Sequence, residues 1–255
     1  MTDTARPAAL VTGGAVRLGR ALALALAEAG YDIALHYGTS ATAAADTAAR
    51  IRSHGVDCLT FRCDLTDVSG LAPMIADALA AFPRLAVLVN SASAYAQGRI
   101  AQTTPEVFAQ QFDVNLRAPF FLTQAFAAQV GQGNVVNIID NKIGYHQFDY
   151  AAYLLSKKAL AEFTAMAAVE FAPGVRVNGV APGVVLPAHT RSEEYIAWRL
   201  QGIPLRRQGQ TGHIAGAMLS LLANEFITGQ VLTVDGGESL AEVGRNAAQF
   251  DPSKV

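Results

Sequence analysis

The chain has few cysteines, little surplus charge and no long apolar run, and each shortage excludes a class of protein. Its 255 residues include 2 cysteines, Cys58 and Cys63, which is too few for a disulfide scaffold. Neither lies near other Cys or His residues at metal-ligand spacing, so we expect two buried, reduced thiols and no metal site. The longest apolar stretch near the N-terminus, Ala21 to Ala27, is too short to span a bilayer.

The chain also lacks a large surplus of positive or negative charge. The chain has 19 basic and 21 acidic residues, for a net charge of −2, which leaves no basic surplus for nucleic acid or anionic lipid. No charged segment precedes an apolar one at the N-terminus, so no signal peptide is expected. We therefore expect a cytoplasmic protein whose partners are small molecules and copies of itself.

Apolar residues are abundant, at 51% against 16% charged, and they follow an alternating pattern that predicts the fold. Short β-branched runs predict buried strands at Ala8–Thr12, Tyr31–Tyr37, Asp57–Arg62, Ala86–Asn90, Asn134–Ile139, Val175–Val180 and Gln230–Val234. Between them, helical patterns cover Leu18–Ala29, Thr42–His54, Ser69–Ala81, Pro105–Gln129, Tyr150–Phe171 and Gly212–Ala223. This order predicts one α/β domain over residues 1–255. It is a Rossmann-type, doubly wound parallel sheet of about seven strands with helices on both faces.

One segment, residues 182–204, breaks this rhythm because it has no clear periodicity. Loops of this length in compact domains are usually functional, and we expect this one to be a substrate lid. The alternative is a surface excursion that contains a short helix.

A Gly-rich turn follows the first predicted strand and opens the first predicted helix, from Thr12 to Gly19. Gly13 permits a tight turn, and Gly19 lets the helix pack close to the strand. The backbone amides at the helix start then face a pyrophosphate. In this context a dinucleotide site is favoured over a plain turn.

The end of the second predicted strand indicates which dinucleotide is bound. NAD sites usually place an acidic residue there to bind the ribose 2′-hydroxyl, but no Asp or Glu occurs until Asp46. Arg17, His36, Thr39 and Ser40 could instead bind a 2′-phosphate. The sequence therefore predicts NADPH rather than NADH.

Tyr153 and Lys157 lie four residues apart on a predicted helix, so they share a face. An ammonium group near a phenol lowers the phenol pKa, which is ordinarily near 10. The spacing therefore predicts that Tyr153 donates a proton near neutral pH. A lone pair at this spacing is also typical of an ordinary helix surface, so its weight depends on the motifs around it.

Together the motifs resemble the short-chain dehydrogenase/reductase family over residues 7 to 240. They are the Gly-rich turn, Asp64-Leu65, Asn90-Ser91-Ala92, Asn115, Tyr153 with Lys157, Pro182-Gly183 and Asp235-Gly236-Gly237. Two positions depart from the common pattern, since Arg17 replaces the middle glycine of the turn and Asp140 replaces the catalytic serine. With Ser93 and Tyr95, these departures resemble the pteridine reductase branch. That resemblance implies NADPH-dependent reduction of pterins or folates by a homotetramer.

The replacement of serine by Asp140 bears on the substrate. Hydride addition to a ketone builds negative charge on oxygen, which an ionised Asp140 would oppose by about 4 kcal/mol at 4 Å and an effective dielectric constant of 20. The rate would fall by roughly three orders of magnitude. A C=N bond instead yields a basic nitrogen that needs a proton, which Asp140 and Tyr153 can supply. This reasoning holds unless burial keeps Asp140 protonated.

The resemblance also implies roles for other residues. Arg17 would bridge the pyrophosphate and the substrate ring, and Tyr95 would stack on that ring against the nicotinamide. Asn115 would support the active-site helix through water. The remaining cofactor positions are Leu18, Tyr37, Asp64, Leu65, Asn90, Ala92, Ser93, Pro182 and Gly183, and Ser93 also borders the substrate. Simpler roles stay open: phosphate binding alone for Arg17, packing for Tyr95, a helix kink for Asn115 and a structural carboxylate for Asp140.

Three functions remain in competition at this stage. The first is a pterin reductase, with Asp140, Tyr153, Lys157 and Asn115 as its catalytic set. The second is a short-chain carbonyl or 3-oxoacyl-thioester reductase that tolerates Asp140. The third is a regulator that binds NADP(H) without catalysis.

Overall fold

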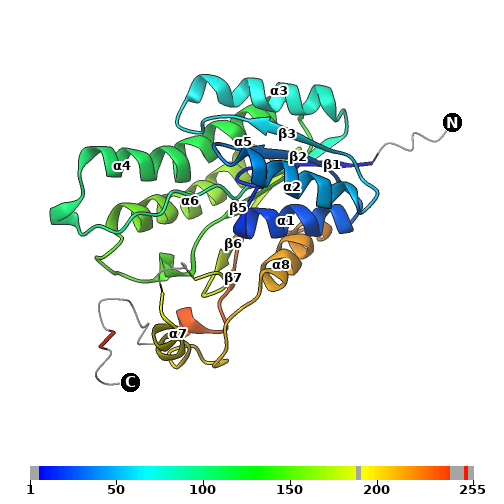
Figure 1. The fold of residues 1–255 in the computed structure, drawn as a ribbon. Helices are drawn as coiled ribbons and strands as arrows, with labels where there is room; N and C mark the ends of the chain where they lie inside the picture. The colour runs from blue at the N-terminus through cyan, green and yellow to red at the C-terminus, as the bar shows by residue number, and fades with distance from the viewer. Residues whose placement is uncertain (1–5, 188–190, 242–249, 252–255) are drawn as a thin grey trace.

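A computed structural model of the chain describes residues 6–187, 191–241 and 250–251. Its centre is one sheet of seven parallel strands in the order β3-β2-β1-β4-β5-β6-β7, which confirms the predicted fold class (Figure 1). The strands are β1 Ala8–Val11, β2 Asp32–Tyr37, β3 Cys58–Arg62, β4 Leu85–Asn90, β5 Gly133–Ile138, β6 Val175–Pro182 and β7 Val231–Val234.

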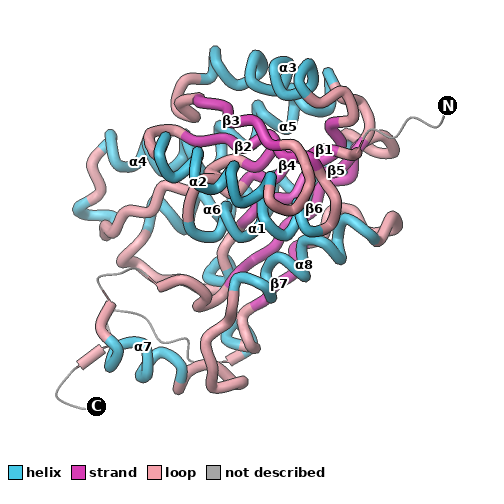
Figure 2. The backbone as a smooth tube through the Cα atoms, turned by 45° about the vertical axis from the view of Figure 1, so that its right-hand side comes forward, coloured by secondary structure: helices cyan, strands magenta, loops and turns pink. Residues whose placement is uncertain are grey.

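Helices cover both faces of this sheet, as Figure 2 shows. They are α1 Arg17–Glu28, α2 Ala41–Arg52, α3 Leu71–Ala81, α4 Pro105–Phe112, α5 Ala118–Gln129, α6 Ala151–Glu170, α7 Glu193–Leu200 and α8 Thr211–Ala223. Short 3-10 turns are η1 Val68–Gly70, η2 Ile100–Gln102, η4 Asn141–Gly144 and η5 Glu238–Leu240, and a π turn, η3, covers Asp113–Arg117. No helix among the described residues is long and apolar enough to cross a membrane.

Strand β1 shows why the sheet is buried on both sides. Ala9 and Val11 pack with α1, α2 and α8, whereas Ala8 and Leu10 pack with α3, α5 and α6. All four are almost completely buried. Because successive side chains of a strand point to opposite faces, an uninterrupted apolar run is what a sheet between two helical layers requires.

The predicted helix Pro105–Gln129 is wrong in one detail, because the π turn η3 separates α4 from α5. Pro119 stands in the first turn of α5 and has no N–H to donate to the preceding turn. The helical hydrogen-bond ladder is therefore interrupted near Asn115, where a single widened turn absorbs the mismatch.

The segment 182–204 contains the short helix α7, which begins after Ser192. The Ser192 hydroxyl accepts the Tyr195 N–H, so this helix has a side-chain N-cap. Figures 1 and 2 place α7 outside the two helical layers. Residues 188–190 of the predicted lid lie outside the described residues.

Candidate active site

The Gly-rich turn joins the carboxyl ends of β1 and β4. The Thr12 hydroxyl accepts the N–H groups of Ser91 and Ala92 at 3.0 and 3.1 Å. Gly13 has a φ of 63°, and a Cβ there would lie 2.9 Å from the Ala92 Cα. Only glycine fits both the backbone angle and the close approach.

The start of α1 fits a dinucleotide. A Cβ on Gly19 would collide with the Gly13 carbonyl, so glycine is needed where the helix passes over the turn. Val16 makes no side-chain cap, and the first turn of α1 has no acidic residue. The N–H groups of that turn are therefore available to an anion, as a pyrophosphate site requires. Leu18 packs against the core at this point.

Arg17 occupies a backbone conformation that favours glycine, with a φ of 51°. A non-glycine residue there carries strain on the order of 1 kcal/mol or more. Its exposed side chain donates from Nη2 to the Leu186 carbonyl at 2.6 Å. Arg17 thus ties the Gly-rich turn to the segment that follows β6, a contact that the sequence did not predict.

His36 does not fit the phosphate-binding role predicted for its side chain. The ring is buried, Nδ1 accepts the Gly13 N–H at 3.0 Å, and Nε2 donates to the Cys63 carbonyl at 3.0 Å. Burial lowers its pKa, so the ring is a neutral brace between β1, β2 and the end of β3. Both nitrogens are used, and neither is left for a phosphate.

Thr39 and Ser40 remain at the predicted position for a 2′-phosphate. Both are exposed where β2 leads into α2, and the Ser40 hydroxyl makes no cap hydrogen bond. Tyr37 is partly buried and packs against the core beside them.

The predicted adenine and ribose positions lie after β3 and β4. The exposed Asp64 carboxylate accepts the Thr66 N–H and hydroxyl, hydrogen bonds that lower the pKa of Asp64. Leu65 is buried beneath it. The buried Asn90 amide donates to the Asn137 Oδ1 at 2.9 Å. Ala92 borders Gly13, and Ser93 is exposed.

Asp140 and Tyr153 are in direct contact. The Tyr153 hydroxyl donates to Asp140 Oδ2 at 2.7 Å, and the Lys142 N–H donates to Asp140 Oδ1 at 2.8 Å. Asp140 follows β5, whereas Tyr153 stands in the first turn of α6. The carboxylate is thus fixed by its own turn and aimed at the phenol.

The pKa values of this pair correct one prediction. Burial, then the charge and the hydrogen bond of Asp140, hold the pKa of Tyr153 well above 10. Burial also raises the pKa of Asp140. The pKa of Tyr153 is therefore raised, not lowered as predicted. The Lys157 Nζ donates to the Ile138 carbonyl at 2.8 Å and lies 6.0 Å from the Tyr153 ring centroid. Burial lowers the pKa of Lys157 to about 8.

Asn115 supports the site through direct hydrogen bonds, and its predicted action through water stays a prediction. Its side-chain amide both accepts from and donates to the Ala94 backbone, at 2.9 and 3.0 Å. It also donates to the Ser156 hydroxyl at 3.0 Å. The π turn that carries Asn115 therefore joins the chain after β4 to α6, the helix that carries Tyr153 and Lys157.

Tyr95 stacks on another tyrosine of the chain. Its ring lies 4.7 Å from the Tyr150 ring at 18° and 4.7 Å from the Tyr153 ring at 86°. Arg191 donates to the Tyr150 hydroxyl at 2.7 Å. Sequence reasoning missed Tyr150 and Arg191, although the position of Tyr150 one turn before Tyr153 was a usable signal.

A buried ionic cluster behind Asp140 was also missed. Glu238 is fully buried and accepts from Lys142 Nζ at 2.9 Å, Arg199 Nη2 at 2.6 Å and Asn141 Nδ2 at 3.0 Å. Arg199 belongs to α7, and the Lys142 backbone holds Asp140. The cluster therefore links α7 to the turn that carries the acid. Nothing in the sequence distinguishes Glu238 from a surface acid.

Pro182 and Gly183 end β6 at the same edge of the sheet. The Gly183 N–H donates to the Val234 carbonyl at 3.0 Å, and a Cβ on Gly183 would lie 2.6 Å from the Asp235 Cβ. Glycine is required there by this close approach to the end of β7.

Comparisons with known proteins agree with this geometry. The family model described as enoyl-(acyl carrier protein) reductase matches residues 14–239. An uncharacterized oxidoreductase of Mycobacterium tuberculosis, MT0954, is 35% identical over 239 residues, which cover 90% of each chain. The 3-oxoacyl-[acyl-carrier-protein] reductase FabG of Staphylococcus aureus is 32% identical over 237 residues, which cover 90% of this chain and 96% of FabG.

The similar solved structures are named as dihydrofolate reductases, whereas the relative FabG is named as a 3-oxoacyl reductase. The FolM alternative dihydrofolate reductase 1 of Brucella suis, in complex with NADP, superimposes with a TM-score of 0.87 at 29% identity and covers 97% of this chain and 98% of its own. The Brucella canis protein of the same name, also complexed with NADP, gives 0.85 at 30% identity, with coverage of 96% and 98%.

Proposed function

Because this chain belongs to the short-chain dehydrogenase/reductase family, whose members are oxidoreductases, we propose that it is an NADPH-dependent reductase of pterin-type C=N bonds, with dihydropterin or dihydrofolate as substrate. The observation that carries this proposal is the 2.7 Å hydrogen bond from Tyr153 to Asp140. A carboxylate in contact with the proton-donating phenol suits a nascent basic nitrogen better than a nascent oxyanion.

The cofactor would be held by residues along the carboxyl edge of the sheet. The first turn of α1 offers N–H groups to the pyrophosphate, and Thr39 and Ser40 stand where no acid repels a 2′-phosphate. NADPH supplies a hydride when bound. Two solved structures similar to this chain contain NADP, which supports the same cofactor here.

Proton transfer falls to Asp140 and Tyr153. The raised pKa of Tyr153 keeps its hydroxyl protonated, and that hydroxyl already donates to Asp140 Oδ2. Burial also raises the pKa of Asp140, which favours proton uptake by this carboxyl. The pair can therefore present a proton to a substrate nitrogen at Tyr153 Oη or Asp140 Oδ2. The Lys157 ammonium holds the end of β5 through Ile138.

The other predicted contacts complete the proposal. Tyr95, which is 57% exposed, offers an aromatic face to a flat ring, and Ser93 borders it. Arg17 would turn from Leu186 toward the pyrophosphate and the ring edge. The segment 182–204 would cover the substrate, and four copies of the chain would form a homotetramer, as the family resemblance implies.

The second candidate is a 3-oxoacyl-thioester reductase, which the name of the Staphylococcus aureus relative favours. Its product oxyanion would form beside Asp140. An ionised carboxylate there would cost about three orders of magnitude in rate. This candidate therefore requires Asp140 to be protonated throughout the reaction. A regulator without catalysis is disfavoured because Tyr153, Lys157 and Asn115 are all assembled at one site.

Steady-state assays separate these candidates. NADPH oxidation would be followed with dihydrobiopterin, dihydrofolate and acetoacetyl thioesters, and repeated with NADH. We expect kcat/KM for a pterin or folate to exceed that for the thioester by about three orders of magnitude. A preference for the thioester would overturn the proposal, and tight NADPH binding without any turnover would favour the regulator.

A further inference from the structure

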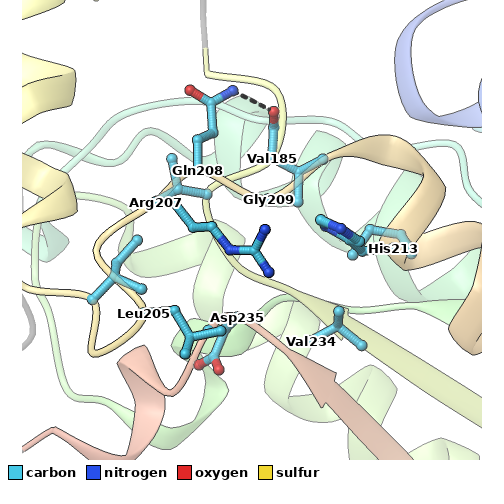
Figure 3. Close-up of a pocket in the computed structure, with 12 residues that line it drawn as sticks. Val185, Leu205, Arg207, Gln208, Gly209, His213, Val234 and Asp235 are labelled. Atoms are coloured by element: carbon cyan, nitrogen blue, oxygen red, sulfur yellow. Dashed lines mark hydrogen bonds between the residues drawn. The ribbon is translucent and has the colours of Figure 1, made fainter.

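A cavity of about 250 Å³ lies at the carboxyl ends of β6 and β7 (Figure 3). Its walls come from residues 184–185 after β6, the chain before α8, the first turn of α8, and the end of β7 with the two residues that follow it. Neither Asp140 nor Tyr153 lines it. The cavity is therefore distinct from the proton-transfer pair, although Val184, Val185 and Ile203 belong to the segment 182–204.

Most of the cavity wall is apolar. The apolar side chains that line it are Val184, Val185, Ile203, Leu205, Ile214 and Val234. Ile203 and Ile214 are almost completely buried, so they form a fixed floor. A wall of this kind favours a ligand with an apolar body over a bare inorganic ion.

Arg207 places a positive charge in this apolar space. Figure 3 shows its guanidinium pointing into the cavity. Within the described ranges, no Asp or Glu lies within ion-pair distance of it. Asp235 also lines the cavity, but its oxygens accept from Asn141, Gly237 and Ser239 and point away from Arg207 in Figure 3. Among the residues that the structure describes, Arg207 therefore has no counter-ion.

His213 supplies a second donor on the opposite side of the cavity. Its Nδ1 accepts the Gln210 N–H at 3.0 Å, which places the ring hydrogen on Nε2. Figure 3 shows the ring facing Arg207 across the same space. Both side chains are solvent-exposed, and they direct hydrogen-bond donors toward the cavity from opposite sides.

From this arrangement we propose that the cavity binds a small monocarboxylate with an apolar body. The carboxylate accepts hydrogen bonds from Arg207 and His213, and the planar guanidinium matches two carboxylate oxygens. The apolar body lies among the valine and isoleucine side chains. A cavity of about 150 Å³ holds benzene, so this larger one, of about 250 Å³, admits a substituted benzoate or a short fatty acid.

The probe that tests this is 4-bromobenzoate, titrated calorimetrically into the full chain saturated with NADPH. Arg207→Met should weaken binding at least tenfold. Arg206→Met is the matched control, because Arg206 does not line the cavity and instead donates to the Gln201 carbonyl. The affinity of Arg206→Met for 4-bromobenzoate should lie within twofold of that of the unaltered chain. Uncharged 4-bromobenzamide should bind the unaltered chain at least tenfold more weakly.

A crystal grown with the probe locates it, since bromine gives an anomalous peak that we expect inside the cavity. Equal affinities of the two arginine variants would overturn the proposal, as would a peak elsewhere or no detectable heat. A peak in the cavity without an affinity difference would mean binding at crystal concentration only, which also overturns it. NADPH oxidation by Arg207→Met should be unchanged, so failure here is distinguishable from failure of the proposed reductase function.

Discussion

The Tyr153 hydroxyl donates to Asp140 Oδ2 over 2.7 Å, and this contact makes the two groups one proton-holding unit. Burial raises the pKa of Asp140, and burial together with the Asp140 carboxylate raises that of Tyr153. Asp140 therefore makes Tyr153 harder to deprotonate, whereas the hydrogen bond from Tyr153 partly offsets the effect of burial on the pKa of Asp140. An isolated tyrosine activated by a lysine, as the sequence spacing predicts, would have the opposite property.

Replacement of Tyr153 by phenylalanine removes the hydroxyl and keeps the ring. We expect Tyr153→Phe to lower kcat by about 10²- to 10⁴-fold, because a positioned proton donor contributes that much. The Kd for NADPH, measured by fluorescence titration, should stay within a few-fold of the parent value.

The matched control is Tyr31→Phe, since Tyr31 lies next to the amino end of β2, at the opposite edge of the sheet. It should leave kcat unchanged. Full activity of Tyr153→Phe would show that Asp140 alone supplies the proton.

The raised pKa of Asp140 makes its effect on stability depend on pH. Between its ordinary value of 3.8 and the higher folded value, the folded chain binds more protons than the unfolded chain. The free energy of unfolding therefore falls as pH rises through that window. Asp140→Asn removes this dependence, so the stability of the variant relative to the parent should rise from pH 4 upward.

Urea unfolding of both proteins at several pH values below 7 measures this difference. Lys157 does not affect this comparison, because its pKa is lowered to about 8 and its contribution to the free energy of unfolding changes only above that pH. The exposed Asp46→Asn serves as control. A stability difference that stays constant, or falls as pH rises, would contradict the buried, proton-holding role of Asp140.

Glu238 pairs with two cations at once, the buried Arg199 and the partly buried Lys142. Glu238→Gln leaves Lys142 and Arg199 without their carboxylate, and removal of one partner from a buried ionic group costs about 3–5 kcal/mol. We expect a loss of that size in the free energy of unfolding. Because the Lys142 backbone holds Asp140, kcat should also fall at temperatures where the variant is fully folded.

Glu170→Gln at the exposed end of α6 provides the comparison for Glu238→Gln and should change neither quantity. Denaturant unfolding monitored by circular dichroism measures the first effect, and steady-state assays measure the second. Equal unfolding midpoints for the two variants would mean that the cluster stabilises nothing.

The sheet could be predicted because buried parallel strands appear in a sequence as short, uninterrupted apolar runs. The helices could be predicted from the helical patterns between those runs. The strand pattern at Ala8–Val11 and the turn at Gly13 needed no tertiary information, since both follow from local chemistry. The contact between Asp140 and Tyr153 was also within reach, because each stands at the start of a segment that leaves the same edge of the sheet.

Other features depended on burial, which a single sequence does not reveal. His36 is a residue type that can bind phosphate, yet hydrogen bonds with Gly13 and Cys63 occupy both of its ring nitrogens. Lys157 has the spacing of a partner for Tyr153, yet its ammonium turns to Ile138. Glu238 is buried against Arg199 of α7. Because α7 lies in a segment without periodicity, the sequence does not predict this contact.

The central claim is that Asp140 adapts the site to a nitrogen in place of an oxyanion. The direct measurement is kcat/KM of Asp140→Ser with dihydrobiopterin and with an acetoacetyl thioester. The account predicts that pterin reduction falls at least about tenfold, because a proton-holding group is lost. Thioester reduction should rise, because an ionised Asp140 would oppose the oxyanion by about 4 kcal/mol. Unchanged pterin reduction by Asp140→Ser would contradict it, whatever happens to thioester reduction.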